Sequence, residues 1–159
     1  MVSKKSEVVE IILQLVSRLS EEQKKELIDN LLKKEEGLPI SIFRSGISGL
    51  EAIVVYLKET KNKSIAEIAA LLKRKKSTIY TTYQKAKRKL NKPLDTSDCS
   101  ILVPYQIFAH RKFSVLESLA KYLKDEQKIP FVKISALLDK KYSTVRTVYV
   151  RYRTKNASK

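Results

Sequence analysis

The amino-acid sequence predicts an all-α protein, and three observations support this prediction. First, apolar residues recur at spacings of three and four along most of the 159-residue chain, which places them on one face of a helix. Second, a serine followed three residues later by glutamine or glutamate precedes two of these stretches, the pattern of a capping box. Third, one pattern of three short helices can be drawn twice, so a single all-helical unit accounts for most of the chain.

The N-terminal stretch, residues 1–37, predicts a helical hairpin. Its first helix ends near Leu19, and Ser20 with Gln23 forms a capping box for a second helix from Glu21 to about Glu35. The stretch holds 7 basic and 8 acidic side chains, so we do not expect it to bind a polyanion. Two helices cannot enclose their own apolar stripe. We expect a second chain to cover it, giving a homodimer, although packing on the rest of the same chain is an alternative. The candidate dimerisation residues are Val8, Ile11, Ile12, Leu15, Leu27 and Leu31.

An internal repeat follows, with copies at residues 38–91 and 101–159 and a predicted linker at 92–100. Pro39 corresponds to Pro104 at an offset of 65, and from Leu50 onward the offset is 66. Residues 50–89 and 116–155 share 15 identities in 40 positions. Two copies indicate a duplicated domain, because a solenoid needs at least about three. The linker is rich in turn formers and could span roughly 30 Å when extended.

Each copy predicts three helices. The first covers Ser48 to Thr60 in copy one and Ser114 to Glu126 in copy two, with Tyr56 and Tyr122 expected at an outer or intermediate edge. The second begins at Ser64, where Glu67 completes a capping box, and at Pro130, which is acceptable at a helix start. The third begins near Ser77 and Ser143, and its inward positions include Ile79 and Val145.

The second and third helices carry a recognisable spacing. Ala69, Lys73 and Ile79 match the small residue, the turn residue and the buried aliphatic residue of a helix-turn-helix motif, and Ser135, Asp139 and Val145 repeat them. The helix starts Ser77-Thr78-Ile79 and Ser143-Thr144-Val145 resemble those of the fourth-region helix-turn-helix of bacterial sigma factors and of related response-regulator and archaeal DNA-binding domains. The resemblance covers about 55 residues twice and leaves the N-terminal hairpin unmatched. The turn has no glycine, and Lys73 is a costlier left-handed residue than Asp139. The sequence has no segment like those that sigma factors use for polymerase binding, so a sigma factor is not implied.

The resemblance implies that the third helix of each copy enters the major groove of double-stranded DNA. The candidate base-reading residues lie on its outward face: Lys76, Ser77, Tyr80, Thr81 and Gln84 in copy one, and Tyr142, Ser143, Arg146, Thr147 and Val150 in copy two. Arg146 could bind guanine through two hydrogen bonds, and Gln84 could bind adenine. The candidate phosphate contacts are Arg74, Lys75, Lys85, Arg88, Lys140, Lys141 and Arg151. Such contacts position a protein without reading sequence.

Charge supports a nucleic-acid partner and weakens other classes. The formal net charge is +16, of which residues 38–95 contribute +9 and residues 96–159 contribute +8. No stretch approaches the roughly 18 apolar residues of a membrane-spanning helix. One cysteine, Cys99, allows neither an internal disulfide nor a CxxC metal cluster, and the single histidine, His110, has no nucleophile in motif context. We therefore expect no enzyme activity, no metal, no cofactor, no small-molecule site and a cytoplasmic, nucleoid-associated location.

The sequence thus predicts a DNA-binding protein with two tandem helix-turn-helix domains, most simply a transcriptional regulator. Two alternatives remain open. One is a DNA-organising protein with little sequence preference, which the abundance of lysine over arginine would suit. The other is an adaptor that binds RNA or polymerase.

Overall fold

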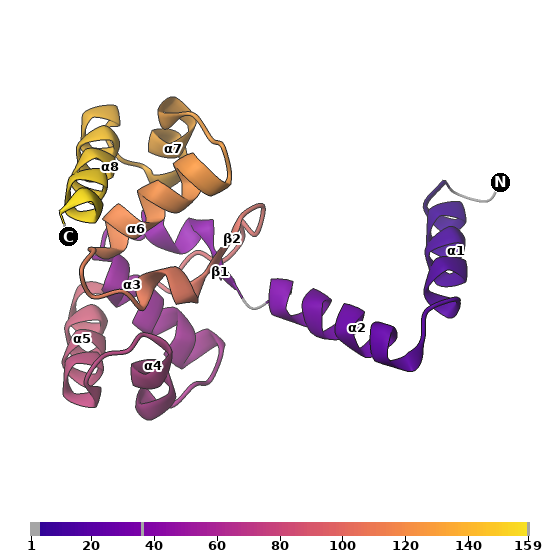
Figure 1. The fold of residues 1–159 in the computed structure, drawn as a ribbon. Coiled ribbons are helices and arrows are strands. Elements are labelled where there is room, and N and C mark those ends of the chain that lie inside the picture. The colour runs from indigo at the N-terminus through magenta and orange to yellow at the C-terminus, as the bar shows by residue number, and fades with distance from the viewer. Residues whose placement is uncertain (1–3, 36, 159) are drawn as a thin grey trace. The chain divides into compact units, whose positions relative to one another are not determined.

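The structure is a computed structural model that describes the backbone of residues 4–35 and 37–158 and the side chains of residues 7–28 and 37–158. The chain divides into two units, residues 1–36 and residues 37–159. The described residues form eight α-helices, a few 3-10 and π-helical turns, and one sheet of two short strands. The prediction of an all-α fold is confirmed (Figure 1).

The N-terminal unit consists of α1, Lys4–Ser17, and α2, Glu21–Glu35. The predicted capping box separates them: the Ser20 hydroxyl accepts from the Gln23 N–H at 3.2 Å, and the Ser20 N–H donates to Gln23 Oε1 at 3.0 Å. The two helices do not form the expected hairpin, because they meet at an angle and do not lie side by side (Figure 1). The apolar side chains of α1 are therefore exposed in this unit.

Residues 37–158 contain the two repeats, which have the same order of elements. The first repeat comprises β1 Gly37–Pro39, a 3-10 helix Ile40–Arg44, α3 Gly49–Val55, a π-helical turn Tyr56–Thr60, α4 Ile65–Leu71 and α5 Lys76–Lys89. The second comprises β2 Leu102–Pro104, a 3-10 helix Tyr105–Phe108, α6 Val115–Lys121, a π-helical turn Tyr122–Glu126, α7 Phe131–Leu138 and α8 Tyr142–Ala157.

Local details recur at equivalent positions. Ser48 and Ser114 each start a helix with a complete capping box. The partner glutamate of each box also forms an ion pair with the end of the third helix, Glu51 with Lys89 at 2.7 Å and Glu117 with Lys155 at 2.9 Å. These pairs join the N-terminus of the first helix to the C-terminus of the third in both repeats. The 15 identities found in the sequence therefore correspond to one three-dimensional unit built twice.

The two repeats are related by an approximate two-fold axis. β1 and β2 pair antiparallel, and Leu38 lies opposite Val103, its own counterpart in the other repeat. The rings of Phe43 and Phe108, another equivalent pair, have centroids 5.9 Å apart. Contacts between equivalent residues are the mark of an isologous, two-fold interface. Here that interface lies within one chain.

A single hydrophobic cluster contains buried residues of both repeats. The segment predicted as a linker, 92–100, is held against the first repeat: Leu94 packs on the core, the Asp98 N–H donates to the Ser41 hydroxyl at 3.3 Å, and Arg44 Nη2 lies 2.7 Å from Asp98 Oδ2. Residues 38–91 and 101–159 are therefore repeats along the sequence that form one compact unit in space.

Tyr56 and Tyr122 were expected near the surface, but they are only 5% and 7% exposed. Chain segments outside these helices explain the difference. Cys99, from the segment between the repeats, lies near Tyr56, and the Tyr122 hydroxyl donates to the carbonyl oxygen of Leu102 on β2 at 3.5 Å. Helical periodicity indicates on which face of its helix each tyrosine lies. It does not indicate which distant segment of the chain covers that face.

Candidate nucleic-acid interface

The turns between α4 and α5 and between α7 and α8 have the same backbone geometry. Lys73 and Asp139 adopt left-handed conformations with φ of 49° and 50°. The next residue closes the turn in each case: the Arg74 N–H donates to the Ala69 carbonyl at 2.9 Å, and the Lys140 N–H donates to the Ser135 carbonyl at 3.0 Å. A left-handed residue followed by such a bond is a standard way to end a helix. The turn residues identified in the sequence therefore do the same structural work in both repeats.

Packing below each turn fixes the following helix. Ile79 on α5 and Val145 on α8 are fully buried, as the spacing predicted. Ala69 is buried on α4, and its equivalent Ser135 on α7 is partly buried. The helices α4 and α5 contact each other directly, as do α7 and α8. In Figure 1, α5 and α8 lie on opposite sides of the central pair α3 and α6.

The outward faces of α5 and α8 are open to solvent. Gln84 is partly buried, and the other base-reading candidates are exposed: Lys76, Ser77, Tyr80, Thr81, Tyr142, Ser143, Arg146, Thr147 and Val150. Two of them have contacts within the chain. The Thr81 hydroxyl donates to the Ser77 carbonyl at 2.9 Å, and the Tyr142 ring lies edge-on to Phe131 with centroids 6.3 Å apart. Neither contact covers the face.

The cations of α5 and α8 fall into two groups. Lys87, Lys89 and Lys155 form ion pairs with glutamates of the same repeat. Within residues 37–158, no ion pair involves any of the phosphate candidates, Arg74, Lys75, Lys85, Arg88, Lys140, Lys141 and Arg151. All of these except Arg74 are exposed. The candidate set therefore carries charge that no carboxylate of the described chain neutralises.

Arg74 is the exception in burial. Its Nε atom is buried and has no hydrogen-bond partner among the described residues. Burial, followed by repulsion from Arg111, lowers the pKa of the Arg74 guanidinium. Arg74 and its equivalent Lys140 line one cavity of about 510 Å³ next to the two-fold axis, together with Gly49 and Val115. The turns of both repeats therefore contribute positive charge to one place.

Sequence reasoning did not identify Arg111 as part of this cluster. The residue lies in the loop before α6, where the two repeats differ by one residue in length, so the repeat pattern gives no counterpart. Its closeness to Arg74 depends on the pairing of the repeats. Knowledge of the two-fold axis would have been needed to find it.

The dimerisation candidates have different environments. Val8, Ile11, Ile12 and Leu15 on α1 are each more than half exposed. Leu27 on α2 is partly buried, and Leu31 belongs to the stretch whose side chains lie outside the described residues. The adjacent Val9 and Leu13 are also more than half exposed, so α1 presents apolar side chains on more than one side.

Comparison of the chain with protein-family models, with curated proteins and with solved structures gives no match in any of the three. None of the described helices is long and apolar enough to cross a membrane.

Proposed function

We propose that this protein binds double-stranded DNA through two helix-turn-helix units, α4–α5 and α7–α8, and regulates transcription. The observation that carries the proposal is the repetition, on each side of an approximate two-fold axis, of one helix with exposed cations that form no ion pair among the described residues. An α-helix fits the major groove, and unpaired lysine and arginine that neutralise phosphates release the cations condensed on the DNA, which favours binding. The resemblance to the fourth-region domains of sigma factors supports the same assignment.

The two-fold relation predicts the form of the DNA site. A DNA-binding protein with two-fold symmetry binds two half-sites that are inverted with respect to each other. The halves should differ in sequence, because Arg146 on α8 stands where α5 has Tyr80, and Val150 stands where α5 has Gln84. We therefore propose an imperfect inverted repeat as the target, with a guanine preference under Arg146.

The charge cluster near the axis supports contact with the centre of such a site. A buried guanidinium nitrogen without a partner is unfavourable unless an anion or water reaches it. Arg74, Lys140 and Arg111 come from both repeats, and a phosphate of the central base pairs is an anion of suitable size and charge. The described residues supply no carboxylate for Arg74.

We also propose that α1 and α2 form a homodimer with a second chain. The apolar side chains of α1 are exposed in the single chain, and the unit has nearly equal numbers of basic and acidic residues. Apolar helix faces of this kind are stabilised by burial in a bundle. A bundle of four helices from two chains would cover them without placing strong positive charges together.

Selection from a random DNA pool tests this function. Full-length protein should enrich an inverted pair of related half-sites. The variant Arg146→Ala should lose preference at one base pair and lose about 1–3 kcal/mol of binding free energy for the selected site. Failure of wild type to bind duplex DNA at low salt would contradict the proposal.

Binding without an enriched motif would favour the DNA-organising role. One observation supports that alternative, since the outward cations of α5 are mainly lysines, which contact phosphate without reading bases.

A further inference from the structure

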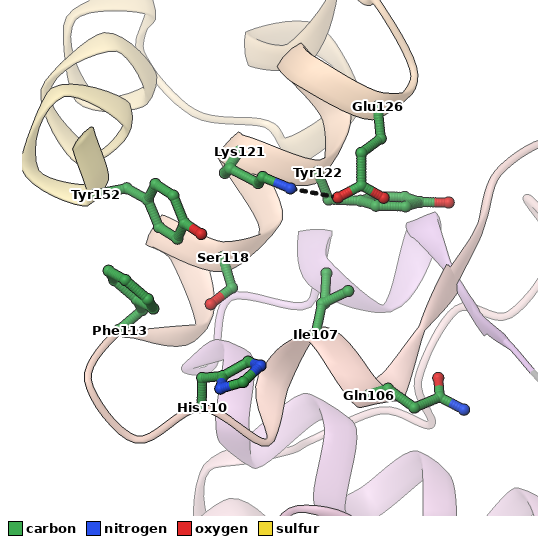
Figure 2. Close-up of a pocket in the computed structure, with 9 residues that line it drawn as sticks. All are labelled: Gln106, Ile107, His110, Phe113, Ser118, Lys121, Tyr122, Glu126 and Tyr152. Atoms are coloured by element: carbon green, nitrogen blue, oxygen red, sulfur yellow. Dashed lines mark hydrogen bonds and ion pairs between the residues drawn. The ribbon is translucent and has the colours of Figure 1, made fainter. Parts of the chain in front are cut away.

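A pocket of about 300 Å³ is open in the second repeat, between the end of α8 and the 3-10 helix Tyr105–Phe108 (Figure 2). Phe113 and Tyr152 stack at one side with ring centroids 4.1 Å apart. The ion pair of Lys121 with Glu126 lies at another side, and His110 and Ile107 lie below it in this view. These residues do not belong to the outward faces of α5 and α8.

The equivalent place in the first repeat is closed. Ser41, Ile42, Ala52 and Ala86 correspond to Gln106, Ile107, Ser118 and Tyr152, and each of the four is fully buried. Val55 is 2% exposed, whereas the side chain of its equivalent Lys121 is 31% exposed. The two repeats therefore differ in their residues at this place and also in whether another part of the chain covers it.

The chain that follows α5 supplies this cover. It leaves α5 at Lys89, about one turn beyond Ala86, passes Leu94, which packs on the core, and reaches the other side of the same place at Asp98 and Cys99. There the Asp98 N–H donates to the Ser41 hydroxyl at 3.3 Å, and Cys99 lies near Tyr56. Residues 91–99 thus lie as an extended strap over the first repeat. In the second repeat, no described residue occupies the corresponding space.

Ser118 places a polar group in the wall of the open pocket. The residue is 4% exposed, and Figure 2 shows its hydroxyl turned toward the space between Phe113, Ile107 and His110. A hydroxyl can both donate and accept, so a docked segment could form a hydrogen bond with it.

We propose that this pocket is a docking groove for an extended peptide segment of a partner protein, which lies there as residues 91–99 lie on the first repeat. A backbone N–H of the peptide would donate to the Gln106 side chain, the counterpart of Ser41. An aliphatic side chain would pack against Phe113 and Ile107. An acidic residue is favoured nearby, because Lys112 Nζ lies 6.0 Å from the centroid of the Phe113 ring and forms no ion pair within the described chain.

A synthetic peptide with the sequence of residues 91–99, with serine in place of Cys99, is the probe. Added to ¹⁵N-labelled full-length protein, it should cause saturable shifts of the backbone amide signals of Ile107, Ser118 and Tyr122. A scrambled peptide of the same composition should bind about tenfold or more weakly, because its leucine no longer meets the apolar wall. The exposed position Gln106 allows a mild variant, and Gln106→Ala should weaken binding roughly threefold to tenfold, whereas Gln14→Ala on α1 should not.

A second experiment fuses the same segment to the end of α8, so that the test does not depend on the affinity of a free peptide. Residues 157–159 are replaced by Asn-Lys-Pro followed by Leu-Asp-Thr-Ser-Asp. The chain after α8 then has the same sequence as residues 91–98, which follow α5. Tethering raises the effective concentration of the segment. The amide hydrogens of Ser118 and Tyr122 should then exchange more slowly, and a graft with aspartate in place of its leucine should not slow them.

The proposal is supported if the peptide shifts the signals of Ile107, Ser118 and Tyr122, or if the graft slows exchange at Ser118 and Tyr122, in each case with the stated discrimination. It is overturned if neither does, or if the scrambled peptide and the aspartate graft are equally effective, which would show only attraction to a basic surface. None of these measurements uses DNA, so their outcome is independent of the function proposed above.

Discussion

The neighbouring lysines of α5 allow the electrostatic argument to be tested with a matched pair of variants. Lys85 is exposed and forms no ion pair within the described residues, whereas Lys87 Nζ lies 2.9 Å from Glu59 Oε1. The two residues have the same chemistry and lie two positions apart on one helix. Only Lys85 should release a counterion on binding phosphate, since Glu59 already balances Lys87.

The magnitude follows from the number of unpaired candidates. If all seven phosphate candidates named above bind, the slope of log affinity against log salt should be about −6, from a contribution of roughly 0.9 for each contact. Affinity should then fall by several thousandfold, roughly, between 50 and 200 mM salt. Lys85→Ala should make the slope less steep by about 0.9 and weaken binding to all duplexes alike, and Lys87→Ala should change the slope by less than about 0.3.

Fluorescence anisotropy with a labelled duplex, titrated at several potassium chloride concentrations, measures these slopes. Circular dichroism of both variants checks that α5 remains folded. A slope that does not change in Lys85→Ala, or that changes equally in Lys87→Ala, would refute the division of cations into structural and DNA-binding groups. A slope near zero for wild type would remove the electrostatic argument entirely.

Further predictions concern stability and assembly. Lys73→Asn should raise the free energy of unfolding by about 0.5–1 kcal/mol and Asp139→Lys should lower it similarly in urea titrations, because asparagine and aspartate tolerate the left-handed conformation better than lysine. Burial favours the protonated form of Glu117, but the hydrogen bonds from Lys155 and Ser114 outweigh it, so the pKa of this carboxyl lies below its ordinary value of 4.5. Its contribution is complete above that value and is lost as pH falls through the lower folded pKa, so the stability difference between wild type and Glu117→Gln should be present at pH 7 and shrink at pH 3. Deleting residues 1–36 should turn a dimer into a monomer that still binds DNA, more weakly, and light scattering of the full-length chain as a monomer at high concentration would contradict the dimer.

Local rules predicted much of the second unit. Helical spacing located all six of its α-helices, and the capping box at Ser64 formed as expected, with the Glu67 N–H donating to the Ser64 hydroxyl at 3.2 Å. The left-handed turn residues Lys73 and Asp139 were also identified from their spacing. These features depend on residues within about ten positions of one another, so they can be recognised directly in the sequence.

Long-range pairing could not be predicted in the same way. The strands Gly37–Pro39 and Leu102–Pro104 are three residues long and end in proline, so they show no alternating pattern. Their pairing brings Phe43 to Phe108 and Arg74 toward Arg111, contacts between residues far apart in sequence. The packing of α1 and α2 is hard to predict for a related reason, because an apolar stripe on a helix does not say what packs against it.

The contacts on the two-fold axis are unequal in a way that only a pair of non-identical halves permits. A Cβ atom on Gly49 would lie 2.6 Å from Val115 Cγ1, and one on Gly37 would lie 2.6 Å from Leu102 Cβ. In both cases the glycine faces the larger residue at its own equivalent position. Two copies of the first half would leave a void there, and two copies of the second half would clash. If the halves were produced as separate polypeptides, each should therefore bind the other in preference to a copy of itself. The single chain then behaves as a heterodimer whose two subunits are covalently joined.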